Sequence, residues 1–117
     1  METLTTGPMI TRKKKVGLNV IELEVDTPRF LIVTDLSEKY SKKFRVNIPF
    51  FAVVDAVTGE EGILWIDGGI KGAFGGADNL ELAVGKSFEI THKGLKALGE
   101  TGQEVNSYEI YEVEITN

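Results

Sequence analysis

Apolar and polar residues alternate along most of this chain, most clearly in its last third. Residues 85–94 and 105–115 each place apolar side chains at nearly every second position, which is typical of a strand with one buried face. The polar stretch between them, residues 94–106, holds three glycines and is too long for a two-residue turn. The pattern predicts a β-hairpin whose long loop projects into solvent.

Similar alternation predicts strands in the first half of the chain. Residues 18–34 read as one long bent strand or two strands that meet near Pro28, which has no amide hydrogen to donate and restricts the residue before it. Residues 35–43 are polar and contain three lysines, so we expect a loop there.

A second hairpin is predicted from residues 44–57 and 63–67, joined by a turn at residues 58–62. Pro49 indicates a sheet edge or a bulge, since a central strand would lose a hydrogen bond there. Apolar spacing within residues 68–84 predicts one short amphipathic helix, despite glycines that each cost about 1 kcal/mol in a helix. The predicted apolar face of the first strand in this hairpin consists of Phe44, Val46, Ile48 and Phe50.

Five strands with a helical insert between the third and the fourth match the OB-fold, a Greek-key barrel whose second and third strands and two long loops face the ligand. We therefore expect an all-β fold with one short helix, a five-stranded OB-fold barrel, over residues 16–117. Residues 1–15 end in Arg12-Lys13-Lys14-Lys15 and are expected to form a flexible basic tail, which either is merely solvated or contacts phosphate.

The composition of the chain limits the classes of function that it can have. The 117 residues are 42% hydrophobic and 26% charged, as in ordinary globular domains, and contain no long apolar run or secretion signal, so we expect a cytoplasmic protein away from membranes. The absence of cysteine excludes disulfides and zinc sites of the usual Cys/His kind. The net charge is −5, but residues 1–45 carry nine Lys and Arg against six Asp and Glu, whereas residues 46–117 carry four against twelve. Any attraction for phosphate must therefore be local.

Aromatic and basic residues form the best candidate site. Tyr40 stands among lysines, and in an OB-fold such residues would lie along one groove, where bases stack on aromatic rings and the backbone contacts cations. A position in the core explains Trp65 about as well as a position in the ligand groove. The same two interpretations are open for Tyr111. The predicted nucleic-acid-binding residues are Tyr40, Lys42, Lys43, Arg45, Asn47, Trp65, Lys93, Lys96 and Tyr111.

The sequence contains no motif that is typical of a catalytic site or of a metal site. His92, the single histidine, is expected to make a hydrogen bond in a partly buried place, because a general base needs an orienting partner and a substrate pocket. Gly85-Lys86-Ser87 resembles the end of a Walker A loop, but Leu80 stands where that loop needs glycine. The acidic residues lack calcium-loop spacing. We predict a protein that is not an enzyme and holds no cofactor or metal.

Residues 85–90, 93–94 and 108–113 resemble the fourth-strand, loop and fifth-strand segment of small single-stranded DNA-binding proteins of bacterial and archaeal viruses. The resemblance implies an OB-fold that coats single-stranded DNA during replication, recombination or repair in the host cytoplasm. It also implies replication or recombination proteins as partners, while the sequence leaves open whether the protein forms a homo-oligomer. Many members recruit partners through an acidic C-terminal tail, whereas this sequence ends almost directly after its last predicted strand. RNA is the alternative ligand, and a protein-interaction or virion-structural β-barrel is the alternative function.

Overall fold

The structure of the chain is a computed structural model that describes residues 10, 19–98 and 102–116. The predicted basic tail, apart from Ile10, lies outside the described residues. In the described part, no helix is long and apolar enough to cross a membrane.

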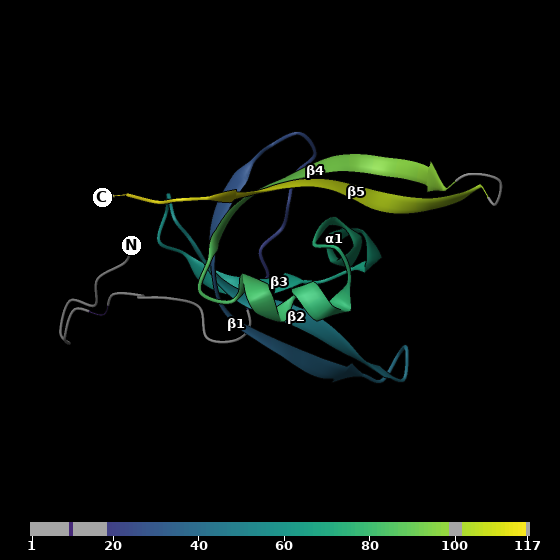
Figure 1. Cartoon of the computed structure of the whole chain (residues 1–117). Helices are drawn as coiled ribbons and strands as arrows, with labels where there is room; N and C mark the ends of the chain where they lie inside the picture. The colour runs from purple at the N-terminus through teal and green to yellow at the C-terminus, as the bar shows by residue number, and fades with distance from the viewer. Residues whose placement is uncertain (1–9, 11–18, 99–101, 117) are drawn as a thin grey trace.

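The fold is mostly β, as predicted, with one short helix between the third and fourth strands (Figure 1). All five strands form one antiparallel sheet in the order β3-β2-β1-β4-β5. The elements in chain order are β1 (Arg29–Ser41), β2 (Val46–Asp55), β3 (Glu61–Trp65), α1 (Gly68–Ala73), two 3₁₀ turns, η1 (Ala77–Asn79) and η2 (Glu81–Ala83), then β4 (Ser87–Leu98) and β5 (Gln103–Val113).

The sheet is not closed into the barrel that the sequence predicts. Its end strands β3 and β5 do not pair with each other in the described part of the chain. The outer edge of β3 pairs instead with the segment before β1, where the Ile21 amide donates to the Ile63 carbonyl at 2.8 Å. Gly62 permits this approach, because a Cβ there would lie 2.5 Å from the Asn19 carbonyl oxygen. The edge that would close the barrel is therefore already occupied.

The helical segment and the sheet share one core. Phe74, just after α1, makes edge-to-face contacts with Phe51 of β2 and Phe88 of β4, at 5.5 and 5.1 Å between ring centroids. The α1 residue Ile70 is fully buried against the same face of the sheet as Leu31. The core thus lies between the helical segment and the face of the sheet that Phe51 and Phe88 share.

The predicted apolar face of β2 is wrong. Phe51, on the opposite face, is the residue that is fully buried, while Phe50 is only half-buried and Phe44 and Val46 are exposed. The reason is that the β1–β2 hairpin continues past the core, so its outer apolar residues have no layer to cover them. Pro49 lies just beyond the last pair of β2 with β3, and its carbonyl still accepts a hydrogen bond from the Ile66 amide at 3.0 Å, so the predicted sheet edge begins only beyond this residue.

Two predicted loops are largely strand. Residues 35–41 continue β1, and residues 94–98 and 103–106 extend β4 and β5. The predicted strand over residues 18–34 is correspondingly shorter, because β1 begins only at Arg29. Both extensions belong to two-stranded ribbons that leave the core, and water reaches both of their faces, so burial did not select an apolar face in residues 35–41, 94–98 or 103–106.

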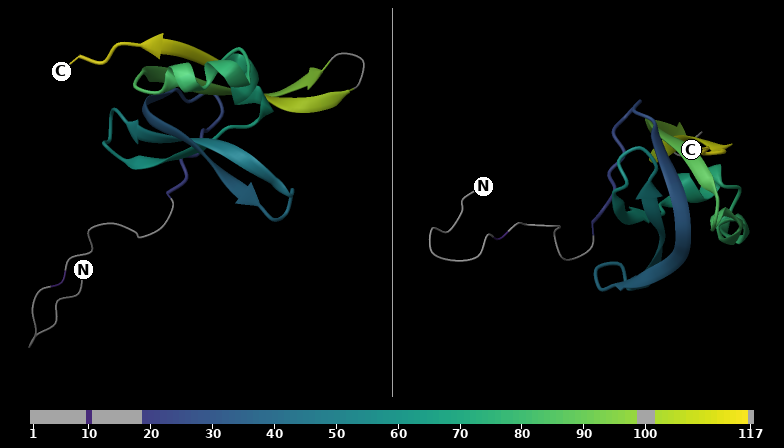
Figure 2. Two further views of the ribbon diagram at one scale, coloured as in Figure 1. Left: turned by 60° about the horizontal axis from the view of Figure 1, so that its bottom comes forward. Right: turned by 90° about the vertical axis from the view of Figure 1, so that its left-hand side faces the viewer.

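We call residues 37–49 the β1–β2 arm, and residues 93–98 with 102–107 the β4–β5 arm. Both arms extend in the same general direction, to the right of Figure 1, and α1 lies between them. Figure 2 shows the two arms from two further sides. The two arms therefore extend on either side of α1.

Candidate nucleic-acid interface

The tip of the β1–β2 arm is a tight turn of residues 42–45. The Arg45 amide donates to the Ser41 carbonyl at 2.7 Å, and the Phe44 amide donates to the Ser41 hydroxyl at 3.2 Å. Arg45 closes the turn with φ at 55°, in the left-handed region. This geometry leaves Lys42, Phe44 and Arg45 exposed to solvent.

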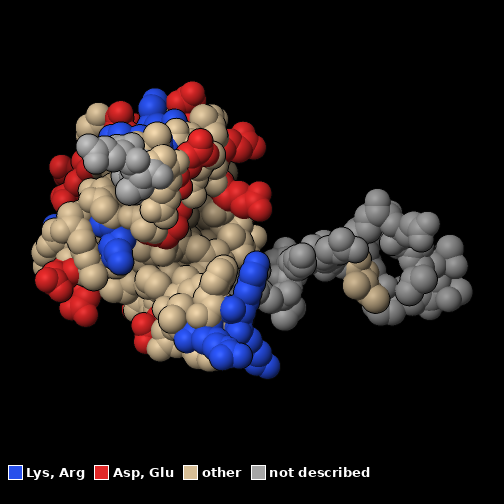
Figure 3. Space-filling view, turned by 90° about the vertical axis from the view of Figure 1, so that its right-hand side faces the viewer, with Lys and Arg blue, Asp and Glu red and all other residues tan. Residues whose placement is uncertain are grey.

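Positive charge concentrates on this arm. Residues 39–45 contain four cations and no acidic residue, and in the described part of the chain none of the four takes part in an ion pair. By contrast, Arg29, Lys86 and Lys93 are each paired with a carboxylate. Figure 3 shows the resulting group of blue atoms at the lower edge of the molecule, where the β1–β2 arm ends. The cations are Lys39, Lys42, Lys43 and Arg45.

Two aromatic rings on the arm are mostly exposed. Tyr40 is 57% exposed and Phe44 is 62% exposed, with the Lys43 ammonium 5.3 Å from the centre of the Phe44 ring. Sequence reasoning missed Phe44, because the alternation placed it on a strand face directed at the core. The cations on both sides of it in Lys42-Lys43-Phe44-Arg45 were the signal that could have identified it.

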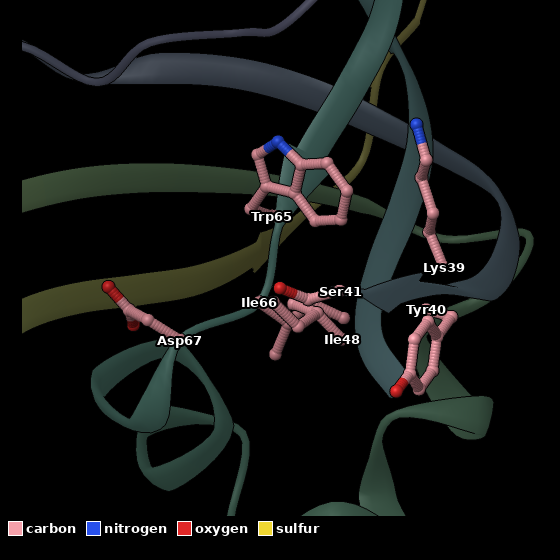
Figure 4. Close-up of a pocket in the computed structure, with 7 residues that line it drawn as sticks. All are labelled: Lys39, Tyr40, Ser41, Ile48, Trp65, Ile66 and Asp67. Atoms are coloured by element: carbon pink, nitrogen blue, oxygen red, sulfur yellow. The ribbon is translucent and has the colours of Figure 1, made fainter. Parts of the chain in front are cut away.

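A cavity of about 510 Å³ lies at the base of this arm (Figure 4). Because β3 ends at Trp65 while β2 continues outward, the cavity opens along the unpaired edge of β2. Trp65 is half-buried and packs edge-on against Phe50, at 5.4 Å between ring centroids. Figure 4 shows Trp65 and Lys39 projecting to one side and the Tyr40 ring to the other. The lining residues are Lys39, Tyr40, Ser41, Ile48, Trp65, Ile66 and Asp67.

A second cavity, of about 210 Å³, adjoins the first and shares Trp65 and Asp67 with it. Its far wall includes His92 and Tyr108 at the base of the β4–β5 arm. His92 is half-buried and lies within hydrogen-bond distance of Asn106, 3.2 Å from Nε2 to Oδ1, which confirms the structural role predicted for it. The two cavities together connect the bases of the two arms.

The structure brings Tyr40 and Trp65 to the same cavity, with the cationic turn next to it. Asn47 lies on the same arm, where its side-chain amide donates to Glu38 at 3.0 Å. Because Tyr40 pairs with Asn47, and Lys39 with Ile48, the register places Tyr40 on the face of the sheet opposite Trp65. A strand that contacts both rings must therefore pass around the open edge of β2.

The remaining predicted residues lie elsewhere, on β4 and β5. Lys93 forms an ion pair with Asp26 at 3.1 Å, which raises the pKa of Lys93, and Lys96 is exposed on the β4–β5 arm. Tyr111 is 53% exposed and lies on the face of the sheet directed away from the core. A hydrogen bond with Glu109 raises its pKa. The structure does not bring these three residues to the cavities.

Comparisons with family models, with curated proteins and with solved structures found no match to this chain. Within the described residues, no group of three or more His, Cys, Asp or Glu side chains could hold a metal ion. The site is thus defined by its own geometry: a cationic, aromatic arm above an apolar cavity.

Proposed function

We propose that this protein binds single-stranded DNA with little sequence preference and coats it during replication, recombination or repair, without chemistry of its own. The observation that supports this most directly is the β1–β2 arm, where four cations without an ion pair among the described residues and two exposed aromatic rings occur within seven residues of an anionic chain. Phosphate would contact the cations, and bases would stack on the rings.

The charge distribution favours a ligand confined to this arm. The chain has a net charge of −5, so a polyanion is repelled by most of its surface. At physiological salt the Debye length is about 8 Å, so the exposed cations of the arm act on a phosphate in contact with them almost independently of distant carboxylates. A flexible single strand can follow such a narrow feature, whereas a rigid duplex meets the acidic surroundings as well.

The order of the strands supports an OB-like site. In the OB-fold, ligands lie on the second and third strands between two long loops. The β1–β2 turn and the β4–β5 arm correspond to those loops, and Trp65 lies at the end of β3. The cavity beside Trp65 therefore lies where an OB-fold would hold a base, although the sheet is open here.

A titration of fluorescently labelled oligo-dT at two salt concentrations tests the proposal, with RNA and duplex DNA of the same length measured in parallel. We expect saturable binding at low salt, weaker binding at high salt and preference for the single strand over the duplex. Stacking should also quench the emission of Trp65, the one tryptophan. Absence of binding at low salt, or binding that salt does not weaken, would contradict the proposal.

Matched variants locate the interface. Replacing Lys42 and Lys43 with alanine should lower the slope of log affinity against log salt by about 0.7 for each phosphate that the variant no longer neutralises. Lys71→Ala removes an exposed cation from α1 instead and should leave the slope unchanged. Equal effects of the two changes would indicate nonspecific attraction and no arm-centred site.

A protein-interaction or virion-structural role is the second candidate, and one surface favours it. Tyr111 is exposed beside Glu109 and across from Glu89, which makes an acidic, aromatic patch suited to a basic protein segment. Two results together would favour this role over DNA binding. Every oligonucleotide titration would fail, and the protein would capture a partner that stays bound after nuclease treatment but is lost in Tyr111→Ala.

A further inference from the structure

Asp67 lies at the junction of the two arms. It follows β3 closely, and its Oδ1 accepts a hydrogen bond from the Ile70 amide at 2.8 Å, which caps α1. Its Oδ2 accepts from the Tyr108 hydroxyl at 2.7 Å and from the Asn106 side-chain amide at 3.0 Å. One carboxylate thus joins the end of β3, the start of α1 and the base of the β4–β5 arm.

The contact continues across the base of that arm. The Asn106 side chain lies within hydrogen-bond distance of His92, and the His92 ring stacks on Tyr108 with ring centroids 5.0 Å apart. His92 and Tyr108 are cross-strand partners immediately before the register of β4 and β5 shifts. Burial, followed by the bond to Asp67, raises the pKa of Tyr108, so its hydroxyl stays a neutral donor. The network therefore holds the point from which the arm extends.

Pairing between β3 and β5 does not hold this junction in the part of the chain that the structure describes, although the segment before β1 gives it one backbone hydrogen bond, from the Asp26 amide to the His92 carbonyl at 2.8 Å. Close packing supports the same junction, because a Cβ on Gly69 would clash with the Asn106 carbonyl oxygen. Asp67 also lines both cavities.

We propose that Asp67 is a positioning residue that fixes the β4–β5 arm relative to the β1–β2 arm. Its consequence for the ligand rests on the proposed function: a fixed arm holds the exposed Lys96 at one distance from the cationic turn of the β1–β2 arm, so that a bound strand can contact both arms. Loss of the carboxylate would let this arm move while the cations and aromatic rings of the β1–β2 arm stay in place.

The distance between the arms tests this directly. The chain has no cysteine, so spin labels can be attached to Val46→Cys and Leu95→Cys, both of which are exposed sites. Asp67→Ser keeps a side chain that can cap α1 but is too short to reach Tyr108 and Asn106. Pulsed electron resonance should give a narrow distance distribution for the parent protein and a distribution at least twice as broad for the Ser variant. The same width in both folded proteins would overturn the proposal.

Two further variants separate positioning from folding. Tyr108→Phe removes one hydrogen bond but keeps the ring that stacks on His92, and should broaden the distribution by a smaller amount. Asp78→Ser changes an exposed acidic residue in η1 that makes no capping bond, and should leave it unchanged. If Asp67→Ser does not fold, an unchanged width in Tyr108→Phe would overturn the proposal.

Oligonucleotide affinity gives an independent readout. We expect Lys96→Ala to weaken oligo-dT binding about threefold in the parent protein and to have no effect in the Asp67→Ser background. An equal loss in both backgrounds would contradict a positioning role. If the protein binds no oligonucleotide, the DNA-binding proposal fails, while the distance measurement still decides the role of Asp67.

Discussion

Arg45 occupies a backbone conformation that disfavours its own side chain. At φ of 55° a residue with a Cβ is less stable by roughly 1–2 kcal/mol than in the right-handed region, and glycine is the usual occupant. An arginine there is consistent with a function for its guanidinium, which the turn exposes next to Lys43 and Phe44.

Arg45→Gly should therefore affect stability and binding in opposite directions. We expect the free energy of unfolding to stay the same or to rise by up to about 1 kcal/mol, while oligo-dT binding weakens and its salt slope falls by about 0.7. Urea denaturation and the titration measure the two effects. A variant that loses stability and keeps full affinity would show that Arg45 serves the turn alone.

Asp55 is the one buried acidic residue described, and its pKa makes stability depend on pH. Burial alone would raise this pKa, but hydrogen bonds from Arg29 and from the amides of Thr58 and Val57 hold it below its ordinary value. A lowered folded-state pKa contributes stability above the unfolded value of about 4, and this contribution is lost as the pH falls through the folded value.

We expect Asp55→Asn to remove the part of the acid-induced loss of stability that comes from this carboxylate. Urea denaturation between neutral and acidic pH measures the free energy of unfolding for both proteins.

The ion pair of Arg29 with Asp55 gives a second test. At neutral pH, Arg29→Ala should lower the free energy of unfolding by about 2 kcal/mol, because it leaves a buried carboxylate unpaired. Lys86→Ala breaks an exposed pair with Glu112 and should cost less than about 1 kcal/mol. Equal losses from the two changes would refute the special role of the Arg29 pair.

At the scale of elements, the sequence predicted both hairpins and the helical insert but not the lengths of the strands. Alternation reports burial of one face, so it located strands wherever they pass over the core, as around Phe88 and Ile90. It failed on the arms, which are strands in water, and it overextended the segment around Ile21, which is buried at one position yet pairs with β3 only through an isolated bridge.

The edge pairing of β3 depends on the absence of a side chain at Gly62. Gly62→Ala should push residues 19–21 off this edge, lower the free energy of unfolding by about 1–2 kcal/mol and speed hydrogen exchange at the Ile21 and Ile63 amides. Gly68→Ala, where a Cβ meets open space, is the control and should be neutral. Unchanged exchange at both amides in Gly62→Ala would show that the segment does not depend on this contact.

In the whole molecule, the uneven distribution of charge could be read from the sequence, but the place where exposed cations gather could not. The excess of Lys and Arg in residues 1–45 could not reveal that Arg29 is neutralised by Asp55 while Lys42 and Lys43 form no ion pair with any described residue, since pairing depends on tertiary contacts. Likewise, no pattern showed that Tyr111 faces away from the cavities. The fold separates an anionic body from one cationic arm, and this separation underlies the proposed function.

Photocrosslinking to an oligonucleotide that carries iodouracil shows where on the protein a bound strand lies. Irradiation at saturating protein, followed by mass spectrometry of the peptides, identifies the side chains that contact bases. We predict crosslinks at Tyr40, Phe44 or Trp65, and their disappearance when salt dissociates the complex. Crosslinks confined to Tyr111 on the outer face of β5, or none at all, would contradict a binding site on the β1–β2 arm.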